Sequence, residues 1–260
     1  MCTLTLLVLW AGLAWTAAGD LSEPQIADMI QKFAAKEAEF SKARDNYTYH
    51  QTVRVQEYDV NGTPGGKWEV VSDIIFTLDG KRTEKVMRAP PVTLHMVQIS
   101  MEDEQDLRSV QPFVLTTKDI DKYYVRYLGK ETLDEIPCYT FAVKPKKMEQ
   151  GQRYFQGIVW VDDRDLQIVK SYGRGTGLLK KGTDQQFPKF ETYREQIDGK
   201  YWFPTFTTAN DTLFFTDNTV RLKMSVKYED YKQFKSDVKI TFGDAVPGGE
   251  PKRGEPKKPQ

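Results

Sequence analysis

The chain has 260 residues, of which 37 are Lys or Arg and 37 are Asp or Glu, so its formal net charge is zero. This balance argues against a nucleic-acid partner, because binding to a phosphate backbone requires a basic excess or a basic stripe. The chain is long enough to bury a large core without disulfide bonds, and 39% of its residues are hydrophobic.

The first residues, MCTLTLLVLWAGLAWTAAGD, form an apolar run that ends in the small residues Thr16, Ala17 and Ala18. This pattern predicts a signal peptide over residues 1–18 that is cleaved after Ala18. The alternative is a membrane anchor, but the run is shorter than the roughly 20 residues that span a bilayer. Cleavage removes Cys2 and leaves Cys138 as the only thiol, so we expect an exported chain without an internal disulfide.

Residues 22–46 carry the signature of one amphipathic helix. Ser22 and Gln25 have the spacing of a capping box, and Pro24 falls in the first turn, where no backbone donor is needed. Apolar residues recur at helical spacing along one face, namely Ile26, Met29, Ile30, Phe33 and Phe40. We expect this stripe to pack against the rest of the protein.

From Asn46 onward the apolar period changes from about 3.6 to 2, which indicates strands. We expect strands over 47–56, 67–78, 81–88, 123–130 and 138–144, hairpins over 153–173 and 189–207, and a last strand over 220–228. Ser100 and Asp103 predict a short capped helix between the third and fourth strands. Since no helices alternate with the strands, the sheet should be antiparallel and the fold mainly β, of the α+β type.

The strands differ in how many faces they bury. Residues 220–228, VRLKMSVKY, alternate strictly, so one face should meet water and the other a dry interior. Residues 154–161, in contrast, are apolar on both faces, so other parts of the protein should shield both faces from water. A single curved sheet with aromatic residues on its concave side, and the long helix packed against that side, satisfies both patterns. The alternative is a small solid barrel that the aromatic side chains fill.

The hairpin over 189–207 contains Asp198-Gly199, which suits a two-residue turn with positive φ at both positions. Such a turn places Glu195 opposite Trp202 and Arg194 opposite Phe203. Pro204 lacks a backbone donor, so it belongs at a sheet edge or a bulge.

Catalytic and metal-binding patterns are weak. His50 and His95 lack the spacing of a zinc site, and Cys138 lies in an apolar strand pattern where a buried, inert thiol is expected. Residues 173–177, GRGTG, lack the Lys-Ser/Thr of a phosphate loop, so we interpret them as a flexible connection; residues 162–165, DDRD, fit a hairpin turn better than a calcium loop. We expect no enzyme activity, no metal and no cofactor.

The order of features resembles the outer-membrane lipoprotein-sorting proteins, the family of the periplasmic lipoprotein carrier. The resemblance spans residues 21–242 and rests on Gly157, Trp160, Val161, Asp162, Leu166, Asp198-Gly199 and Trp202-Phe203-Pro204. It implies an unclosed β-barrel in which the long helix and the short helix form a lid over a hydrophobic cavity that receives acyl chains. We therefore expect a carrier-like domain over residues 19–243 and, after it, a disordered tail over 244–260 rich in Pro, Gly and Lys.

The function that this resemblance implies is that of a monomeric periplasmic carrier, which moves the acyl chains of lipids or lipoproteins toward the outer membrane with membrane-protein partners. The expected cavity lining is Ile30, Phe33, Val53, Phe76, Trp160, Trp202, Phe203, Leu222 and Met224. Arg82 is expected to hold the lid. The alternative is a lipid- or lipoprotein-binding sensor that acts through a protein partner, and a hydrolase that uses His50 or His95 is a third hypothesis.

Overall fold

The computed structural model describes residues 21–77, 81–179, 182 and 184–233. The predicted signal peptide over 1–18 and the predicted tail over 244–260 lie outside the described residues. Within the described part, the helices are α1 (Glu23–Arg44) and α2 (Met101–Gln105), which continues as a π-turn (Asp106–Val110), and a short 3₁₀ turn (Ile120–Lys122). The strands are β1 (Tyr47–Tyr58), β2 (Pro64–Phe76), β3 (Arg82–Arg88), β4 (Tyr123–Leu133), β5 (Ile136–Pro145), β6 (Tyr154–Asp162), β7 (Ile168–Thr176), β8 (Phe190–Ile197), β9 (Tyr201–Phe214) and β10 (Thr219–Gln233).

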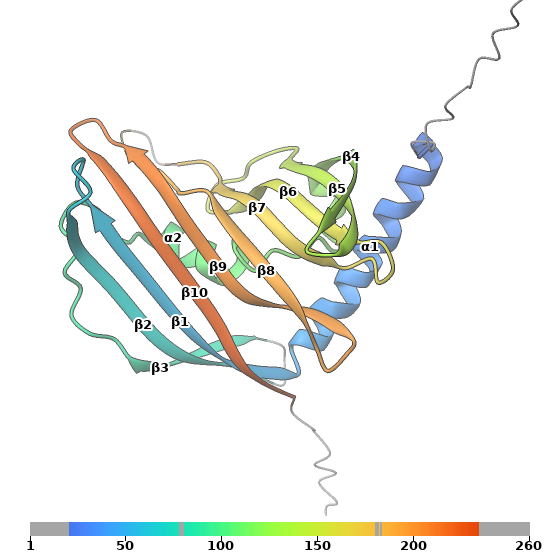
Figure 1. The fold of residues 1–260 in the computed structure, drawn as a ribbon, viewed down its shortest axis with the longest axis horizontal. Coiled ribbons are helices and arrows are strands. Elements are labelled where there is room, and N and C mark those ends of the chain that lie inside the picture. Colours follow the sequence, from blue (N-terminus) through green and yellow to red (C-terminus); the bar gives the residue numbers. More distant parts are fainter. Residues whose placement is uncertain (1–20, 78–80, 180–181, 183, 234–260) are drawn as a thin grey trace, which may run out of the picture.

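All ten strands form one antiparallel sheet in the order β3-β2-β1-β10-β9-β8-β7-β6-β5-β4 (Figure 1). No pairing joins β3 to β4 among the described residues, so the predicted curved, unclosed sheet is confirmed. The chain must nevertheless run from β3 at one edge to β4 at the other. Residues 89–122 make this crossing and carry α2; we call them the cross-connection.

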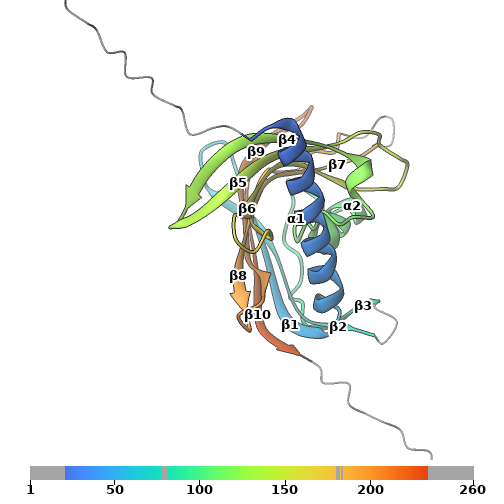
Figure 2. The same cartoon turned by 90° about the vertical axis from the view of Figure 1, so that its right-hand side faces the viewer.

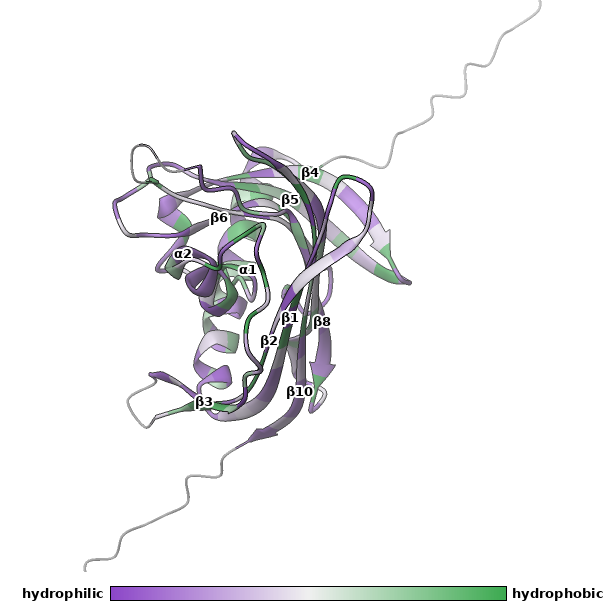
Figure 3. Cartoon of the chain, turned by 90° about the vertical axis from the view of Figure 1, so that its left-hand side faces the viewer, coloured by the Kyte–Doolittle hydropathy of each residue, from purple (hydrophilic) through white to green (hydrophobic). Residues whose placement is uncertain are grey.

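The two helices lie in the curve of the sheet. Figure 2 shows α1 along the concave side, and Figure 3 shows α1 and α2 within the same curve from the opposite direction. The predicted capping boxes are both present, at Ser22 with Gln25 and at Ser100 with Asp103. Because these caps satisfy backbone donors that a helix leaves unpaired, they fix where each helix begins.

The core fills the space between α1 and the concave face. Phe33 is fully buried and its ring packs against Phe141 of β5 at 5.2 Å between centroids. Phe40, two turns further along α1, packs edge-on against Phe203 of β9 at 5.1 Å. The predicted alternation of β10 is confirmed, since Val220, Leu222, Met224, Val226 and Tyr228 are all buried while the Arg and Lys residues between them are exposed.

Two predicted details of the hairpins are wrong. Residues 173–176 belong to β7, where Gly173 pairs with Gly157 of β6, so this stretch is an ordered strand and not a flexible connection. The β8–β9 loop holds three residues, 198–200, although φ is positive at Asp198 and Gly199 as expected. The extra loop residue shifts the register by one.

As a result, Glu195 faces Phe203 and Arg194 faces Pro204. The predicted bulge at Pro204 is present, because the β8–β9 register shifts between Tyr193 and Arg194, directly opposite this proline. The predicted turn at Asp162 is also present: its carboxylate accepts the backbone N–H groups of Arg164 and Asp165 at 2.8 and 2.6 Å.

Candidate functional site

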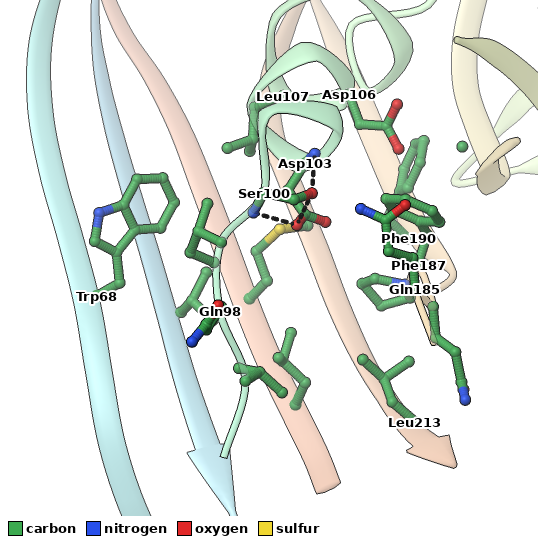
Figure 4. Close-up of a pocket in the computed structure, with 18 of the residues that line it drawn as sticks. Trp68, Gln98, Ser100, Asp103, Asp106, Leu107, Gln185, Phe187, Phe190 and Leu213 are labelled. Atoms are coloured by element: carbon green, nitrogen blue, oxygen red, sulfur yellow. Dashed lines mark hydrogen bonds between the residues drawn. The ribbon is translucent and has the colours of Figure 1, made fainter. Parts of the chain in front are cut away.

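A cavity of about 320 Å³ lies between the concave face and the cross-connection, with the segment 184–188 on its other side. Figure 4 shows Trp68 of β2 on one side of it and Phe187, Phe190 and Leu213 on the other. Its apolar lining also includes Val55, Met96, Val97, Ile99, Leu107, Phe215, Leu222 and Met224. The volume falls at the lower end of the range of about 300–1,000 Å³ that ligand pockets occupy.

The polar groups gather where α2 meets the cavity. Ser100 and Asp103 bond each other: the Ser100 backbone N–H donates to the Asp103 carboxylate at 2.8 Å, and the Asp103 N–H donates to Ser100 Oγ at 3.2 Å. Gln111 is buried and its Nε2 lies 3.4 Å from Met224 Sδ, but its side-chain oxygen has no protein partner. This buried oxygen is not exposed to the cavity, whose polar border is formed by side chains such as those of Gln98 and Asp103.

Asp106 and Arg153 form a buried ion pair beside the cavity. Arg153 donates from Nε and from a terminal nitrogen to the two carboxylate oxygens of Asp106 at 2.8 and 2.6 Å. The guanidinium also stacks over the ring of Phe187, 3.8 Å from its centroid. A Cβ at Gly175 would lie 1.8 Å from the Asp106 carboxylate, so only glycine leaves room for this pair. Burial raises the pKa of Asp106 to about 6, and Arg153 offsets only part of this rise.

Glu37 and Arg194 form a second buried pair, deeper in the core. Arg194 on β8 donates to both carboxylate oxygens of Glu37 on α1, at 3.1 and 3.2 Å, and a further N–H of Arg194 donates to the carbonyl of Phe113. The Ile168 N–H, at the start of β7, donates to Glu37 at 2.9 Å. Burial raises the pKa of Glu37 and lowers that of Arg194. One pair thus joins the helix, two strands and the cross-connection.

Glu57 anchors the cover of the cavity. Its fully buried carboxylate accepts backbone N–H groups from Gly66 on β2 and from His95, Met96 and Val97 on the cross-connection, at 2.8–3.3 Å. Burial favours the neutral acid, but these N–H bonds outweigh it and lower the pKa of Glu57. A Cβ at Gly66 would lie 1.8 Å from the carbonyl oxygen of Thr93, so glycine permits the close approach.

Of the nine residues predicted to line a cavity, the structure places two there, Leu222 and Met224. Ile30, Phe33, Val53 and Phe76 belong to the packed core around the cavity and do not border it. That any of the nine contacts an acyl chain stays a prediction.

The three aromatic residues of the hairpins lie elsewhere. Trp160 is on the outer face of β6, where its indole N–H donates to Glu131 at 2.8 Å, because it alternates with the buried Val159 and Val161. Trp202 donates its indole N–H to Asp165 in the β6–β7 turn at 3.1 Å. Phe203 is fully buried against Phe40 and Tyr47.

The hydrogen bonds of Arg82 lie within the sheet, and that Arg82 holds the lid stays a prediction. It donates to Gln51 on β1 at 2.9 Å and to Glu84 on its own strand at 3.0 Å, so both of these partners belong to the sheet. Two other arginines connect the sheet to the segments on its concave side: Arg153 binds Asp106 of the cross-connection, and Arg194 binds Glu37 of α1. A signal for the second was present in the sequence, since Glu37 interrupts the apolar stripe between Phe33 and Phe40 and so requires a buried cation.

The other reactive residues are engaged in structural contacts. His50 contacts Asp73 at 2.9 Å and His95 contacts Glu57 at 2.8 Å. Cys138 is a buried free thiol, as predicted. The described residues hold no group of three or more His, Cys, Asp or Glu arranged for a metal ion. The helices of that part of the chain also include none that is long and apolar enough to cross a bilayer.

Comparisons with known proteins find similarity in structure only. The sequence matches no family model and no curated protein. Among solved structures, a DUF1329 family protein from Desulfovibrio piger is 15% identical, covers 82% of this chain and 94% of its own, and gives a TM-score of 0.43. A LolA superfamily protein from Nitrosomonas europaea is 11% identical, covers 80% of this chain and 93% of its own, and gives a TM-score of 0.36. A putative outer membrane lipoprotein-sorting protein domain from Vibrio parahaemolyticus is 12% identical, covers 79% of this chain and 94% of its own, and also gives a TM-score of 0.36. These structural neighbours include the family that the sequence resembles, and the functional proposals rest on this chain's own residues.

We expect Arg194→Met to lower the free energy of unfolding by about 3–5 kcal/mol, because it leaves the Glu37 carboxylate buried without its cation. Urea denaturation measures the change. Lys227→Met, at an exposed position on β10, is the matched control and should change stability by less than about 0.5 kcal/mol. A double variant, Glu37→Leu with Arg194→Met, should regain part of the loss; no recovery would show that lost packing, and not the unpaired charge, causes the destabilisation.

Burial raises the pKa of the Cys138 thiol to about 11. Since the thiolate is the reactive form, a thiol reagent should modify Cys138 only after the protein unfolds. The rate of labelling in the native state and in urea measures this, and rapid labelling of the native protein would contradict it.

Asp106 ionises near pH 6 when folded and near its ordinary value of 3.8 when unfolded, so the folded state binds the extra proton between these values. The stability that this group contributes is therefore complete below pH 3.8 and is lost as the pH rises through 6, by at most about 3 kcal/mol. Unfolding curves across this range should show a steeper decline for the wild type than for Asp106→Asn. Parallel profiles would contradict the assignment.

Proposed function

We propose that this protein carries an acyl chain of a lipid or lipoprotein in the cavity under the cross-connection, after export to the periplasm. The observation that supports this most strongly is the apolar lining itself, contributed by Trp68, Phe190, Leu213 and their neighbours. Each CH₂ group that leaves water for such a site is worth about 0.8 kcal/mol, so a long chain gains several kcal/mol even where it is only partly enclosed. A cavity of about 320 Å³ suits one chain.

The charged groups beside the cavity have structural bonds that suit a carrier better than an enzyme. Asp103 is the cap partner of Ser100, and Asp106 is held by Arg153 through two hydrogen bonds. Ser100 Oγ donates to the Asp103 carboxylate at 2.7 Å, but the same carboxylate oxygen also accepts the Ser100 backbone N–H at 2.8 Å, so Asp103 caps the helix and is not a base reserved for a nucleophile. This geometry favours binding without chemical change.

The cover of the cavity is suited to admit and release a chain. It consists of non-helical backbone around residues 96–99, fixed mainly through N–H bonds to Glu57, and of the segment 184–188. Hydrogen bonds to single side chains, and not a ladder of backbone bonds, hold these two segments, so they open at lower free-energy cost than the strands beneath them. Gln98 borders the cavity beside this cover, and its side-chain amide can form a hydrogen bond with the ligand's polar end.

A substitution on the cover tests this proposal. Val97 borders the cavity, whereas Val92, on the same cross-connection, is 57% exposed and does not. We expect the wild type to bind a fluorescent fatty acid that palmitate displaces, and Val97→Trp to weaken binding by about tenfold or more, because the indole occupies the space.

The matched variant Val92→Trp should bind as the wild type does, and circular dichroism should confirm that both variants fold. If the wild type excludes every acyl probe, or if both variants bind equally well, the cavity is not the acyl site.

A further inference from the structure

A second hollow lies on the outer face of the sheet, on the side away from α1. It is an open groove of about 940 Å³ over β4–β7, and we call it the outer-face groove. The cross-strand pairs Arg126–Ala142, Ala142–Ile158 and Ile158–Tyr172 run across the groove in one row, with Ala142 and Ile158 at its floor. The small side chain of Ala142 leaves the floor low, and the larger side chains around it form the rim.

The rim is cationic. Arg126, Lys144, Arg174 and Lys189 all border the outer-face groove and are exposed, and none of them has an ion-pair partner within the described part of the chain. Elsewhere on the same face, Lys170 does have one, Glu191 at 3.4 Å. No carboxylate borders the groove. In a chain of zero net charge, four unpaired cations around one hollow create a local positive potential that an anionic ligand would relieve.

Two exposed tyrosines complete the rim. Tyr124 is 55% exposed and Tyr172 is 37% exposed. The ammonium groups of Lys144 and Lys146 lie over the Tyr124 ring, 5.4 and 5.7 Å from its centroid, as cation–π contacts. Tyr and Arg around an apolar floor are the side chains that protein interfaces favour, since they provide contact area and hydrogen bonds together.

We propose that the outer-face groove binds an acidic, extended segment of a partner protein, with an apolar side chain of that segment over Ala142 and Ile158. The carboxylates of the segment would meet the four rim cations. A bilayer surface carries negative charge too, but it is flat and would leave the recessed floor unfilled, so the shape favours a polypeptide. This surface faces away from the cavity, and the inference does not depend on acyl binding.

Fluorescence anisotropy with two labelled peptides tests the proposal. The probe is EDELFEDE, and the charge-reversed KRKLFKRK is its control. We expect the full chain without its signal peptide to bind the acidic peptide only, and more weakly as salt rises. Arg126→Glu combined with Arg174→Glu should weaken binding about tenfold or more. The matched control, Lys223→Glu with Lys227→Glu on exposed positions of β10, should change it less than about twofold.

Ala142→Phe tests the hollow without changing charge, and it should also weaken binding, because the new ring fills the floor. Circular dichroism confirms that each variant folds. Any of three results would overturn the proposal: the wild type does not bind the acidic peptide, the two charge-reversal variants lose affinity equally, or Ala142→Phe binds normally. Binding to phosphatidylglycerol vesicles that depends on Arg126 and Arg174, without peptide binding, would assign the groove to a membrane surface instead.

Discussion

A buried ion pair between Glu37 and Arg194 fixes how the elements inside this protein are arranged. Glu37 and Arg194 are 157 positions apart in the sequence, and both are buried. A buried charge is stable only when it is paired with an opposite charge and its remaining polar atoms are hydrogen-bonded. The additional partners of Glu37 and Arg194 are the Ile168 N–H and the Phe113 carbonyl. Because these groups belong to α1, β7, β8 and the cross-connection, the pair is satisfied only when all four elements are in place. The position of α1 and the cross-connection on the sheet follows from that requirement.

The cavity results from the way in which α1 and the cross-connection share the cover of the concave face. α1 covers part of the concave face with Phe33 and Phe40, and the cross-connection covers the rest on its way from β3 to β4. The cross-connection is held at its non-helical part by the buried carboxylate of Glu57 and at its π-turn by the pair of Asp106 with Arg153, and not by packed side chains alone. Charged anchors of this kind fix the backbone but fill little volume, and an apolar space remains beneath them.

The sequence predicts those features whose pattern is local. Strict alternation in β10 predicts which face of that strand is buried, and the two capping boxes predict where the helices begin. The structure confirms these predictions. The inward face of β6 was not decidable in the same way, because both of its faces are apolar, and Trp160 proved to lie outside. The buried ion pairs join residues that are far apart in the chain, so periodicity signals that Glu37 needs a partner without identifying Arg194.

The central claim is that an acyl chain enters the space between the sheet and the cross-connection. Methyl NMR of a protein with ¹³C-labelled methionine tests it directly, because Met96 and Met224 border the cavity, whereas Met101 is 82% exposed and Met29, on α1, is buried in the core. Addition of palmitate should shift the methyl resonances of Met96 and Met224 and leave those of Met101 and Met29 in place. Unchanged Met96 and Met224 signals, or a shift confined to Met101, would contradict the account.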